Sequence, residues 1–286
     1  MIDLHVHSTA SDGSFSPLSL IAEAAKRGIT AIALTDHDTI KGNEEAAEAA
    51  FERGIRFIPG IELEIRWKLG GEFHLLGLGI SKPSLGFLTA LEELARGRQE
   101  RNMEIVERMN NAGIDASYDD VVSLANSSGV GHSIGRPHFA AFLTKRKIVK
   151  NHEQAFLRYL GKGKPFFIPK AGLEFERAVE IIRESGGLAV LAHPMSLYVS
   201  WGQLPDLISG LKQKGLDGLE AWHPNTKISS CKRLEALGKS LGLCVTAGSD
   251  FHGEARPDRK LGITAGGKKI DETYLEGLPN HDARIS

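Results

Sequence analysis

The sequence predicts an α/β fold, a distorted (β/α)7 barrel with an inserted small helical subdomain. Short apolar runs alternate with helical patterns along much of the 286 residues, which is typical of βαβ units. About seven strands are expected, and nearly every one carries a His, Asp or Glu at or just past its end. In an open sheet, seven strands would spread these side chains over roughly 30 Å. A closed barrel collects them around one mouth, so we favour it over the alternative, a doubly wound open sheet.

Asp3, His5 and His7 alternate with apolar residues at the start of the chain, which predicts a strand. Side chains two residues apart point to the same face of a strand, so His5 and His7 could share one metal ion. The polar turn that follows would bring the Asp12 carboxylate back toward the strand end. A His-x-His pair is more often an ordinary polar face, and the metal interpretation therefore depends on the rest of the chain.

The barrel is expected to continue with two helices and three strands. Ser16 has the residue type of an N-cap and Pro17 suits the first helical position. In chain order we expect a helix at 17–27, a strand at 31–34, a helix at about 42–53, and strands at 55–58 and 73–78. The strand at 31–34 is followed by Thr35-Asp36-His37-Asp38, and the strand at 55–58 is followed by Pro59-Gly60-Ile61-Glu62. His74 lies near the start of the strand at 73–78. The alternation predicts parallel strand pairs.

Three further strands are expected after residue 186. Their apolar runs occupy residues 187–192, 219–222 and 243–247. They end in His193-Pro194, His223-Pro224 and Gly248-Ser249-Asp250-Phe251-His252. In a barrel, these polar side chains would meet those of the first strands at the same mouth.

A helical subdomain at residues 97–164 is expected to interrupt the barrel and divide it into residues 1–96 and 165–286. A long amphipathic helix is predicted at 85–111, followed by shorter helices near 118–125, 136–143 and 153–160. This is too long for a barrel loop, which usually has only a handful of residues. We expect the subdomain to overhang the barrel mouth.

The insertion is strongly basic. Between residues 121 and 173 the only acidic residue is Glu153, and nine basic residues give this segment +8 in a chain of net charge −1, so the remainder carries −9. The nine are Arg136, Lys145, Arg146, Lys147, Lys150, Arg158, Lys162, Lys164 and Lys170. A solvated surface is one explanation, but for the whole cluster we favour a lid that attracts anions. The Gly-Lys-Gly-Lys run at 161–164 lacks the spacing of a P-loop.

The composition is that of an ordinary globular protein, with 41% hydrophobic and 25% charged residues. Cys231 and Cys244 form neither a disulfide framework nor a Cys-x-x-Cys pair, and we expect reduced packing residues. No apolar run approaches the length of a membrane span. Met1 leads directly into a strand, so no signal peptide is expected and we predict a cytoplasmic protein.

Several motifs follow one another along the chain: His5-x-His7, Asp12, Thr35-Asp36-His37-Asp38, Gly60-Ile61-Glu62, His74, Ala192-His193-Pro194 and Gly248-Ser249-Asp250-Phe251-His252. Together and in this order they resemble the PHP family, named after polymerase and histidinol phosphatase. The helical insertion, with Gly135-Arg136-Pro137-His138-Phe139, further resembles a stand-alone bacterial branch of that family. Members of this branch act as nucleoside 3′,5′-bisphosphate phosphatases and as 5′-to-3′ exoribonucleases on short RNA.

The resemblance implies a site for up to three divalent metal ions. Mixed imidazole and carboxylate ligands suit Mn²⁺, Fe²⁺ or Zn²⁺ better than Mg²⁺ or Ca²⁺. By this resemblance His5, His7, Glu62 and Asp250 hold one ion, Glu62 bridges to a second with His74 and His193, and Asp12, His37 and His252 hold the third. A hydroxide that bridges the ions would attack a nucleotide phosphate, and no protein nucleophile is then required.

Catalytic and substrate-binding roles are expected for further residues. His223 would bind phosphate or donate a proton to the leaving oxygen, and Arg136 would grip a second phosphate through two parallel hydrogen bonds. Lys162, Lys164 and Ser133 are also expected to bind substrate.

The sequence leaves two possible roles for each of three carboxylates near the expected ligands. Asp3 would orient a ligand imidazole or be a buried structural residue. Asp36 and Asp38 would orient imidazoles or cap the next helix.

Two alternative functions stay open. One is a small-molecule phosphatase of the histidinol-phosphate type, and the basic insertion argues against it. The other is a non-catalytic PHP module, and the complete set of ligand types argues against it. The expected partners are a phosphorylated nucleotide or short RNA, with no membrane and no obligatory protein partner.

Overall fold

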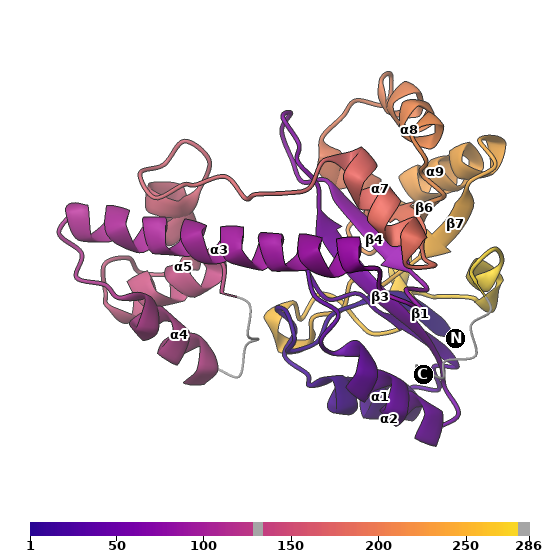
Figure 1. Ribbon diagram of the computed structural model, residues 1–286, viewed down its shortest axis with the longest axis horizontal. Helices are drawn as coiled ribbons and strands as arrows, with labels where there is room; N and C mark the ends of the chain where they lie inside the picture. The colour runs from indigo at the N-terminus through magenta and orange to yellow at the C-terminus, as the bar shows by residue number, and fades with distance from the viewer. Residues whose placement is uncertain (128–133, 280–286) are drawn as a thin grey trace.

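A seven-stranded sheet forms the centre of the computed structural model, which describes residues 1–127 and 134–279. The strands neighbour one another in chain order. They are β1 (Ile2–Val6), β2 (Ala31–Leu34), β3 (Arg56–Glu64), β4 (His74–Leu78), β5 (Leu188–Leu191), β6 (Gly218–Trp222) and β7 (Cys244–Ala247). The two edges nearly meet, because Val6 forms a parallel bridge with Phe251, just beyond β7. The expected distorted barrel is therefore confirmed (Figure 1).

Strand β4 differs from the all-parallel pairing that we expected. It runs antiparallel to both β3 and β5, while the other neighbours are parallel. Residues 65–73 are too few for a crossover helix, since a parallel connection needs about a dozen residues or more, and the chain forms a hairpin instead. The reversal brings His74, the first residue of β4, opposite Glu64, the last residue of β3. His74 therefore reaches the mouth from the start of its strand.

Five helices pack on the outside of the barrel. They are α1 (Pro17–Lys26), α2 (Asn43–Glu52), α7 (Phe175–Glu184), α8 (Leu204–Gln213) and α9 (Ile228–Ser240). The backbone N–H of Ser19 donates to the Ser16 hydroxyl, so the expected N-cap of α1 is confirmed. Leu20 and Ile21 of α1 and Ala46 of α2 share a buried cluster with Ile32 of β2. Burial of these apolar faces holds the helices to the sheet.

Helix α3 (Leu85–Asn111) joins the barrel to the inserted helices, and it spans the range predicted from the sequence (Figure 1). Its first half contributes Phe87 and Leu94 to the barrel core. Its second half contributes Ile105 and Met109 to a separate core. That second core also contains residues from α4 (Tyr118–Ser127), α5 (Arg136–Lys145), α6 (His152–Ala155) and a π-helical turn (Phe156–Leu160).

The subdomain division at residues 97–164 stays a prediction. Phe166 and Ile168, beyond residue 164, also pack in the core of the inserted helices. We refer below to residues 97–168 as the insertion.

The remaining elements are short. Strands β8 (Ile263–Thr264) and β9 (Lys268–Lys269) form a separate antiparallel pair. Single 3-10 turns occupy Pro194–Leu197, Gly253–Ala255, Ala265–Gly267 and Glu272–Leu275. Within residues 1–127 and 134–279, none of the helices combines the length and the apolar character that crossing a membrane requires.

Candidate metal centre

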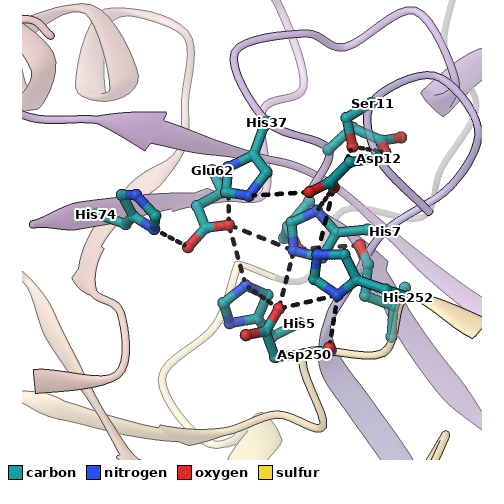
Figure 2. A network of polar contacts seen from close by, with 12 residues as sticks. His5, His7, Ser11, Asp12, His37, Glu62, His74, Asp250 and His252 are labelled. Carbon is teal, nitrogen blue, oxygen red and sulfur yellow. Dashed lines mark hydrogen bonds and ion pairs between the residues drawn. The ribbon is translucent and has the colours of Figure 1, made fainter. Parts of the chain in front are cut away.

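The nine residues expected to bind metal lie together at the barrel mouth, with Glu62 near their centre (Figure 2). Its Oε2 lies 3.3 Å from His7 Nε2 and 3.1 Å from His37 Nδ1. Its Oε1 lies 2.9 Å from both His74 Nδ1 and His193 Nε2. Burial raises the pKa of Glu62, but the charges of His37 and His74 outweigh it and hold the pKa well below its usual range. The carboxylate is therefore ionised, as coordination requires.

Asp250 and Asp12 complete the cluster on the other side. Asp250 Oδ1 lies 3.2 Å from His7 Nε2 and 3.4 Å from His252 Nδ1. Asp12 Oδ1 lies 3.3 Å from His252 Nε2, and the Asp12 side chain is more exposed than the other ligands. Three groups have ligand atoms within 4.8 Å of one another: His5, His7, Glu62 and Asp250; His7, Asp12, His37 and His252; and His37, Glu62 and His74.

The imidazoles fit divalent ions because several of their nitrogens are otherwise unsatisfied. Among the described residues, His5 Nε2, both ring nitrogens of His7, and His252 Nε2 are buried without a hydrogen-bond partner. A buried polar atom without a partner is destabilising. Metal ions would supply the missing partners, and the mixed nitrogen and oxygen donors suit Mn²⁺, Fe²⁺ or Zn²⁺.

Tight turns after the strands present the clustered side chains. Asp250 (φ 50°) and His193 (φ 26°) adopt left-handed backbone conformations that non-glycine residues rarely use. Gly248, two residues before Asp250, lies against β1: a Cβ there would be 2.3 Å from His5 Cβ. The sharp turn therefore needs glycine at this position.

Asp3 is a buried structural carboxylate. Its Oδ2 accepts hydrogen bonds from the Ser249 hydroxyl (2.5 Å) and the Gly262 N–H (2.7 Å), and its Oδ1 accepts from the Ser249 N–H (2.9 Å). Burial raises the pKa of Asp3 to about 6, although the hydrogen bonds from Ser249 and Gly262 oppose this. Of its two expected roles, the structural one is thus realised, because Asp3 holds the turn that leads to Asp250.

Asp36 and Asp38 also hold loops rather than imidazoles. Asp36 accepts hydrogen bonds from the N–H and hydroxyl of Ser8 (2.8 and 2.6 Å) and from the Ser11 hydroxyl (2.5 Å). It thereby fixes the turn that carries Asp12. Asp38 accepts from the Glu64 N–H (3.0 Å) and pairs with Arg98 of α3. Neither carboxylate caps α2, which begins after Gly42 without a side-chain cap.

Three charged residues next to the cluster, of which Glu220 and Arg259 are buried and Glu64 is partly buried, were not predicted from the sequence. Glu64 Oε2 lies 3.0 Å from His74 Nε2 and accepts a hydrogen bond from Lys170 (2.5 Å). Arg259 donates to Asp250, and Glu220 contacts His5 (3.0 Å). Glu220 could have been found from the sequence, because it is an acidic residue inside the apolar strand at 218–222. Arg259 lies in an irregular segment without periodicity, so the sequence gives no such indication for it.

A cavity of about 660 Å³ lies over the cluster, between the barrel mouth and the insertion. His223 lines it, and its Nε2 lies 3.1 Å from Asp250 Oδ2. Arg136, at the start of α5, lines the opposite wall. Two of the nine basic residues counted in the sequence, Arg136 and Lys170, line this cavity. The others do not, so the basic charge of the insertion is less concentrated at the mouth than expected.

Lys162 and Lys164 are not brought to the cavity lining. Both lie in a tight turn after the π-helical segment, where the Lys164 N–H donates to the Gly161 carbonyl, and both side chains are exposed. The turn directs both side chains to solvent. Ser133 lies outside the described residues.

Comparisons with known proteins identify the family. The PHP domain family model matches residues 3–178. The 5′-3′ exoribonuclease of Haemophilus influenzae is 36% identical over 250 residues, covering 87% of this chain and 89% of the relative. The 3′,5′-nucleoside bisphosphate phosphatase of Chromobacterium violaceum is 33% identical over 263 residues, covering 92% and 91%.

Solved structures show the same fold. An amidohydrolase from Chromobacterium violaceum, solved with bound sulfate and no metal, has a TM-score of 0.80 and 32% identity, covering 95% of this chain and 92% of that chain. The match covers most of both chains, so the two proteins share the barrel and the insertion. The chain therefore belongs to the PHP domain family and is an enzyme that hydrolyses phosphate esters.

Proposed function

We propose that the substrates are phosphate esters of nucleotides, namely nucleoside 3′,5′-bisphosphates or short 5′-phosphorylated RNA. The observation that carries this proposal is a nine-residue imidazole and carboxylate cluster beneath a cavity whose far wall is basic. The relatives from Haemophilus influenzae and Chromobacterium violaceum, which act on RNA and on nucleoside bisphosphates, support it. The reduced cysteines are consistent with a cytoplasmic enzyme, which we retain as part of the proposal.

The cluster would hold up to three divalent ions, with Mn²⁺, Fe²⁺ and Zn²⁺ as candidates. One ion would be held by His5, His7, Glu62 and Asp250, a second by Glu62, His74 and His193, and a third by Asp12, His37 and His252. Three such ions carry +6 against −3 from the carboxylates, a surplus that favours a phosphate ligand. When bound, divalent ions polarise the phosphoryl oxygens and activate water.

His223 is proposed to contact the leaving oxygen of the substrate. The backbone N–H of Asn225 donates to its Nδ1 (3.3 Å), so in the neutral ring the proton is on Nε2. Burial lowers the pKa of His223, and the hydrogen bond that its Nε2–H donates to the Asp250 carboxylate only partly opposes this. The Nε2–H, which donates to Asp250 Oδ2 in this structure, lies beside the cluster, and we propose that it turns to the phosphate or the leaving oxygen when substrate binds.

Arg136 is proposed to bind a second anion on the substrate. It lines the cavity from the insertion, opposite the cluster that would bind the scissile phosphate. A guanidinium can hold a phosphate through two parallel hydrogen bonds. This arrangement favours nucleotides over a small amino-alcohol phosphate such as histidinol phosphate.

A substrate screen tests the proposal. The purified enzyme with added Mn²⁺ would be incubated with adenosine 3′,5′-bisphosphate, a short 5′-phosphorylated RNA and histidinol phosphate, and released phosphate and nucleotides would be quantified. We expect hydrolysis of the bisphosphate, the RNA or both at far higher kcat/KM than of histidinol phosphate. A preference for histidinol phosphate would overturn the proposal.

A further inference from the structure

Most basic residues of the insertion lie outside the cavity over the metal cluster, which we call the main cavity. Residues 144–164 contain seven Lys and Arg residues and one acidic residue, so this segment carries +6 and the rest of the chain carries −7. All seven basic residues are exposed. The insertion projects to one side of the barrel (Figure 1). This separation of charge attracts polyanions to the insertion rather than to the barrel surface.

Three of these cations line a second cavity, an open groove of about 500 Å³ on the insertion, which we call the outer groove. They are Lys147, Lys150 and Arg158, and Thr144 and Gln154 add a hydroxyl and an amide to the lining. Among the described residues, none of the three cations forms an ion pair with a carboxylate. Their charges are therefore available to an anionic ligand.

Lys147 occupies a backbone position that usually belongs to glycine. It follows α5 in a left-handed conformation (φ 58°). Its N–H donates to the Thr144 carbonyl (3.0 Å), and the Ile148 N–H donates to the Leu143 carbonyl (3.0 Å). This pair of bonds is the Schellman motif, in which glycine is common because a Cβ disfavours positive φ. The end of the helix does not require this cation, since Lys145 already supplies one to the last turn.

Arg158 is held in place by its neighbour Tyr159. Its guanidinium carbon lies 5.1 Å from the centre of the Tyr159 ring, and its Nη2 donates to the Tyr159 hydroxyl (3.2 Å). The Tyr159 ring stacks in turn on Phe166, with the ring centres 5.1 Å apart. The guanidinium group is thereby oriented while the residue stays exposed, and a planar fork fixed in this way suits a phosphate.

Two elements connect the outer groove to the main cavity. Helix α5 lines the main cavity with Arg136 and the outer groove with Thr144, eight residues or roughly 12 Å further along the helix at about 1.5 Å per residue. The π-helical turn lines the main cavity with Phe156 and the outer groove with Arg158. A polymer that leaves the main cavity along α5 therefore reaches the outer groove directly.

We propose that the outer groove binds the sugar-phosphate backbone of single-stranded RNA, downstream of the 5′ end that is hydrolysed. The inference rests on the proposed function and deepens it, because it distinguishes RNA that extends beyond the main cavity from nucleoside bisphosphates. Contacts from Lys and Arg to the backbone position a nucleic acid without reading its sequence, so RNA of any sequence binds. A polybasic surface also attracts anionic membranes, but continuity with the main cavity favours RNA.

The first test measures the affinity for a long RNA. Single-stranded RNA of about 20 nucleotides, labelled at its 3′ end and carrying phosphorothioate linkages that slow hydrolysis, would be titrated with the Mn²⁺-loaded protein at several salt concentrations. Each neutralised phosphate of a single strand contributes about −0.7 to the slope of log K against log salt concentration. Combining Lys147→Gly, Lys150→Gln and Arg158→Gln should make this slope shallower by about 2 and weaken binding roughly 100-fold at about 0.1 M salt.

Turnover separates the outer groove from the main cavity. The triple variant should lower kcat/KM for a 5′-phosphorylated RNA of the same length by about 10- to 100-fold, because the lost contacts bind this substrate. Adenosine 3′,5′-bisphosphate ends within the main cavity, so its kcat/KM should change by less than about twofold. Equal losses on both substrates, or no loss on the long RNA, would overturn the proposal.

A second triple variant is the matched control for charge. Lys26→Gln, Lys82→Gln and Lys232→Gln together remove three positive charges from exposed residues that line neither cavity. This variant should keep the wild-type affinity for the long RNA within about twofold. The same loss of affinity in both triple variants would show that net charge, and not the outer groove, attracts RNA.

Lys147→Gly by itself controls for folding. Glycine adopts the left-handed conformation without a Cβ penalty, so this variant should melt no lower than the wild type. It should still weaken binding of the long RNA about fivefold at about 0.1 M salt, since one phosphate contact is lost. Wild-type RNA affinity in this variant would remove Lys147 from the proposed surface and overturn the argument from its backbone.

Binding and hydrolysis together separate failure of this inference from failure of the proposed function. RNA affinity that depends on the outer groove, without hydrolysis of RNA, would support the groove and refute RNA as a substrate. Hydrolysis of RNA with an affinity that the triple variant leaves unchanged would do the opposite. Vesicles of phosphatidylserine and phosphatidylcholine test the other anionic partner. Vesicle binding that depends on the groove, with RNA binding that does not, would assign this surface to a membrane and overturn the proposal.

Discussion

Glu220 of β6 connects two of the proposed metal ligands. Its Oε1 accepts a hydrogen bond from His5 Nδ1 (3.0 Å), and its Oε2 accepts one from the backbone N–H of His193 (2.7 Å). Because Nδ1 donates the ring proton, His5 Nε2 is left with a lone pair that faces Glu62 (3.4 Å). The second bond supports the left-handed turn at His193. Glu220 therefore positions ligands without facing the substrate.

Replacing Glu220 should weaken metal binding. Glu220→Gln keeps the shape but removes the charge that holds the His5 tautomer, and loss of such an outer partner typically costs about 10- to 100-fold in metal affinity. Titration of the metal-free protein with Mn²⁺ or Zn²⁺, followed by calorimetry, measures this directly. Glu176→Gln is the control, since Glu176 pairs with Lys214 on the exposed surface. An unchanged dissociation constant in Glu220→Gln would refute the positioning role.

Metal removal should abolish activity and lower stability. Among the described residues His5 Nε2, both ring nitrogens of His7 and His252 Nε2 have no hydrogen-bond partner, so chelation leaves them buried and unsatisfied. Ions that bind only the folded state stabilise it, and we expect the melting temperature to fall on chelation and to recover with Mn²⁺. Hydrolysis and melting should be followed in the same samples. Full activity in protein shown by elemental analysis to be metal-free would contradict the metal centre.

Glu62→Ala should be more damaging than Asp12→Ala. Glu62 is buried and its two oxygens face five imidazoles, whereas the Asp12 side chain is 37% exposed at the edge of the cluster. Loss of an outer partner alone costs about 10- to 100-fold, so loss of this central ligand should lower kcat by more than about 100-fold. Both variants should be assayed at matched metal content. Near wild-type turnover in Glu62→Ala would exclude a bridging role.

Gly248→Ala should destabilise the protein at the mouth. The added methyl group would lie 2.3 Å from His5 Cβ and 2.6 Å from Glu220 Oε1, and overpacking of this kind costs about 1–3 kcal/mol of unfolding free energy. Denaturant unfolding measures the change.

Gly210→Ala is a matched control for that substitution. Gly210 lies inside α8, and a Cβ there has nothing within 4 Å. Alanine should stabilise this helix by about 0.5–1 kcal/mol. Equal effects of the two substitutions would show that the close approach at Gly248 does not limit stability.

Cys244 should react slowly with iodoacetamide at neutral pH. Burial raises the pKa of its thiol, the Asp217 charge raises it further, and the resulting value is about 11. The thiolate is the reactive form, so at pH 8 only roughly one thiol in a thousand is reactive. Labelling followed by mass spectrometry should accelerate about tenfold per pH unit between pH 7 and 10. Rapid labelling of the native protein at pH 7 would show that the thiolate is stabilised instead.

The sequence by itself determined the helix at 85–111, most strand positions and the residue types of the metal cluster. Local periodicity decides those elements, because apolar spacing specifies which face is buried. The strand ends carry His7, His37, His193 and Asp250, and any closed barrel brings such ends together. The convergence of these four residues therefore followed from chain order, whereas His74 reaches the mouth only because β4 is reversed.

Tertiary structure alone decided the reversed strand β4 and the partners of the buried charges. From the sequence alone, Arg101 is one of several arginines on an amphipathic helix, and His138 is interpreted as a surface or packing residue. Polar side chains of α3 are covered by segments from elsewhere in the chain: Asn102 donates to the Ile134 carbonyl and Arg101 to that of Ile168. Helical periodicity reports only which face is apolar, and it carries no information about which distant segment covers a charge or leaves it unpaired. Whether such a cation is solvated or buried is decided by those long-range contacts.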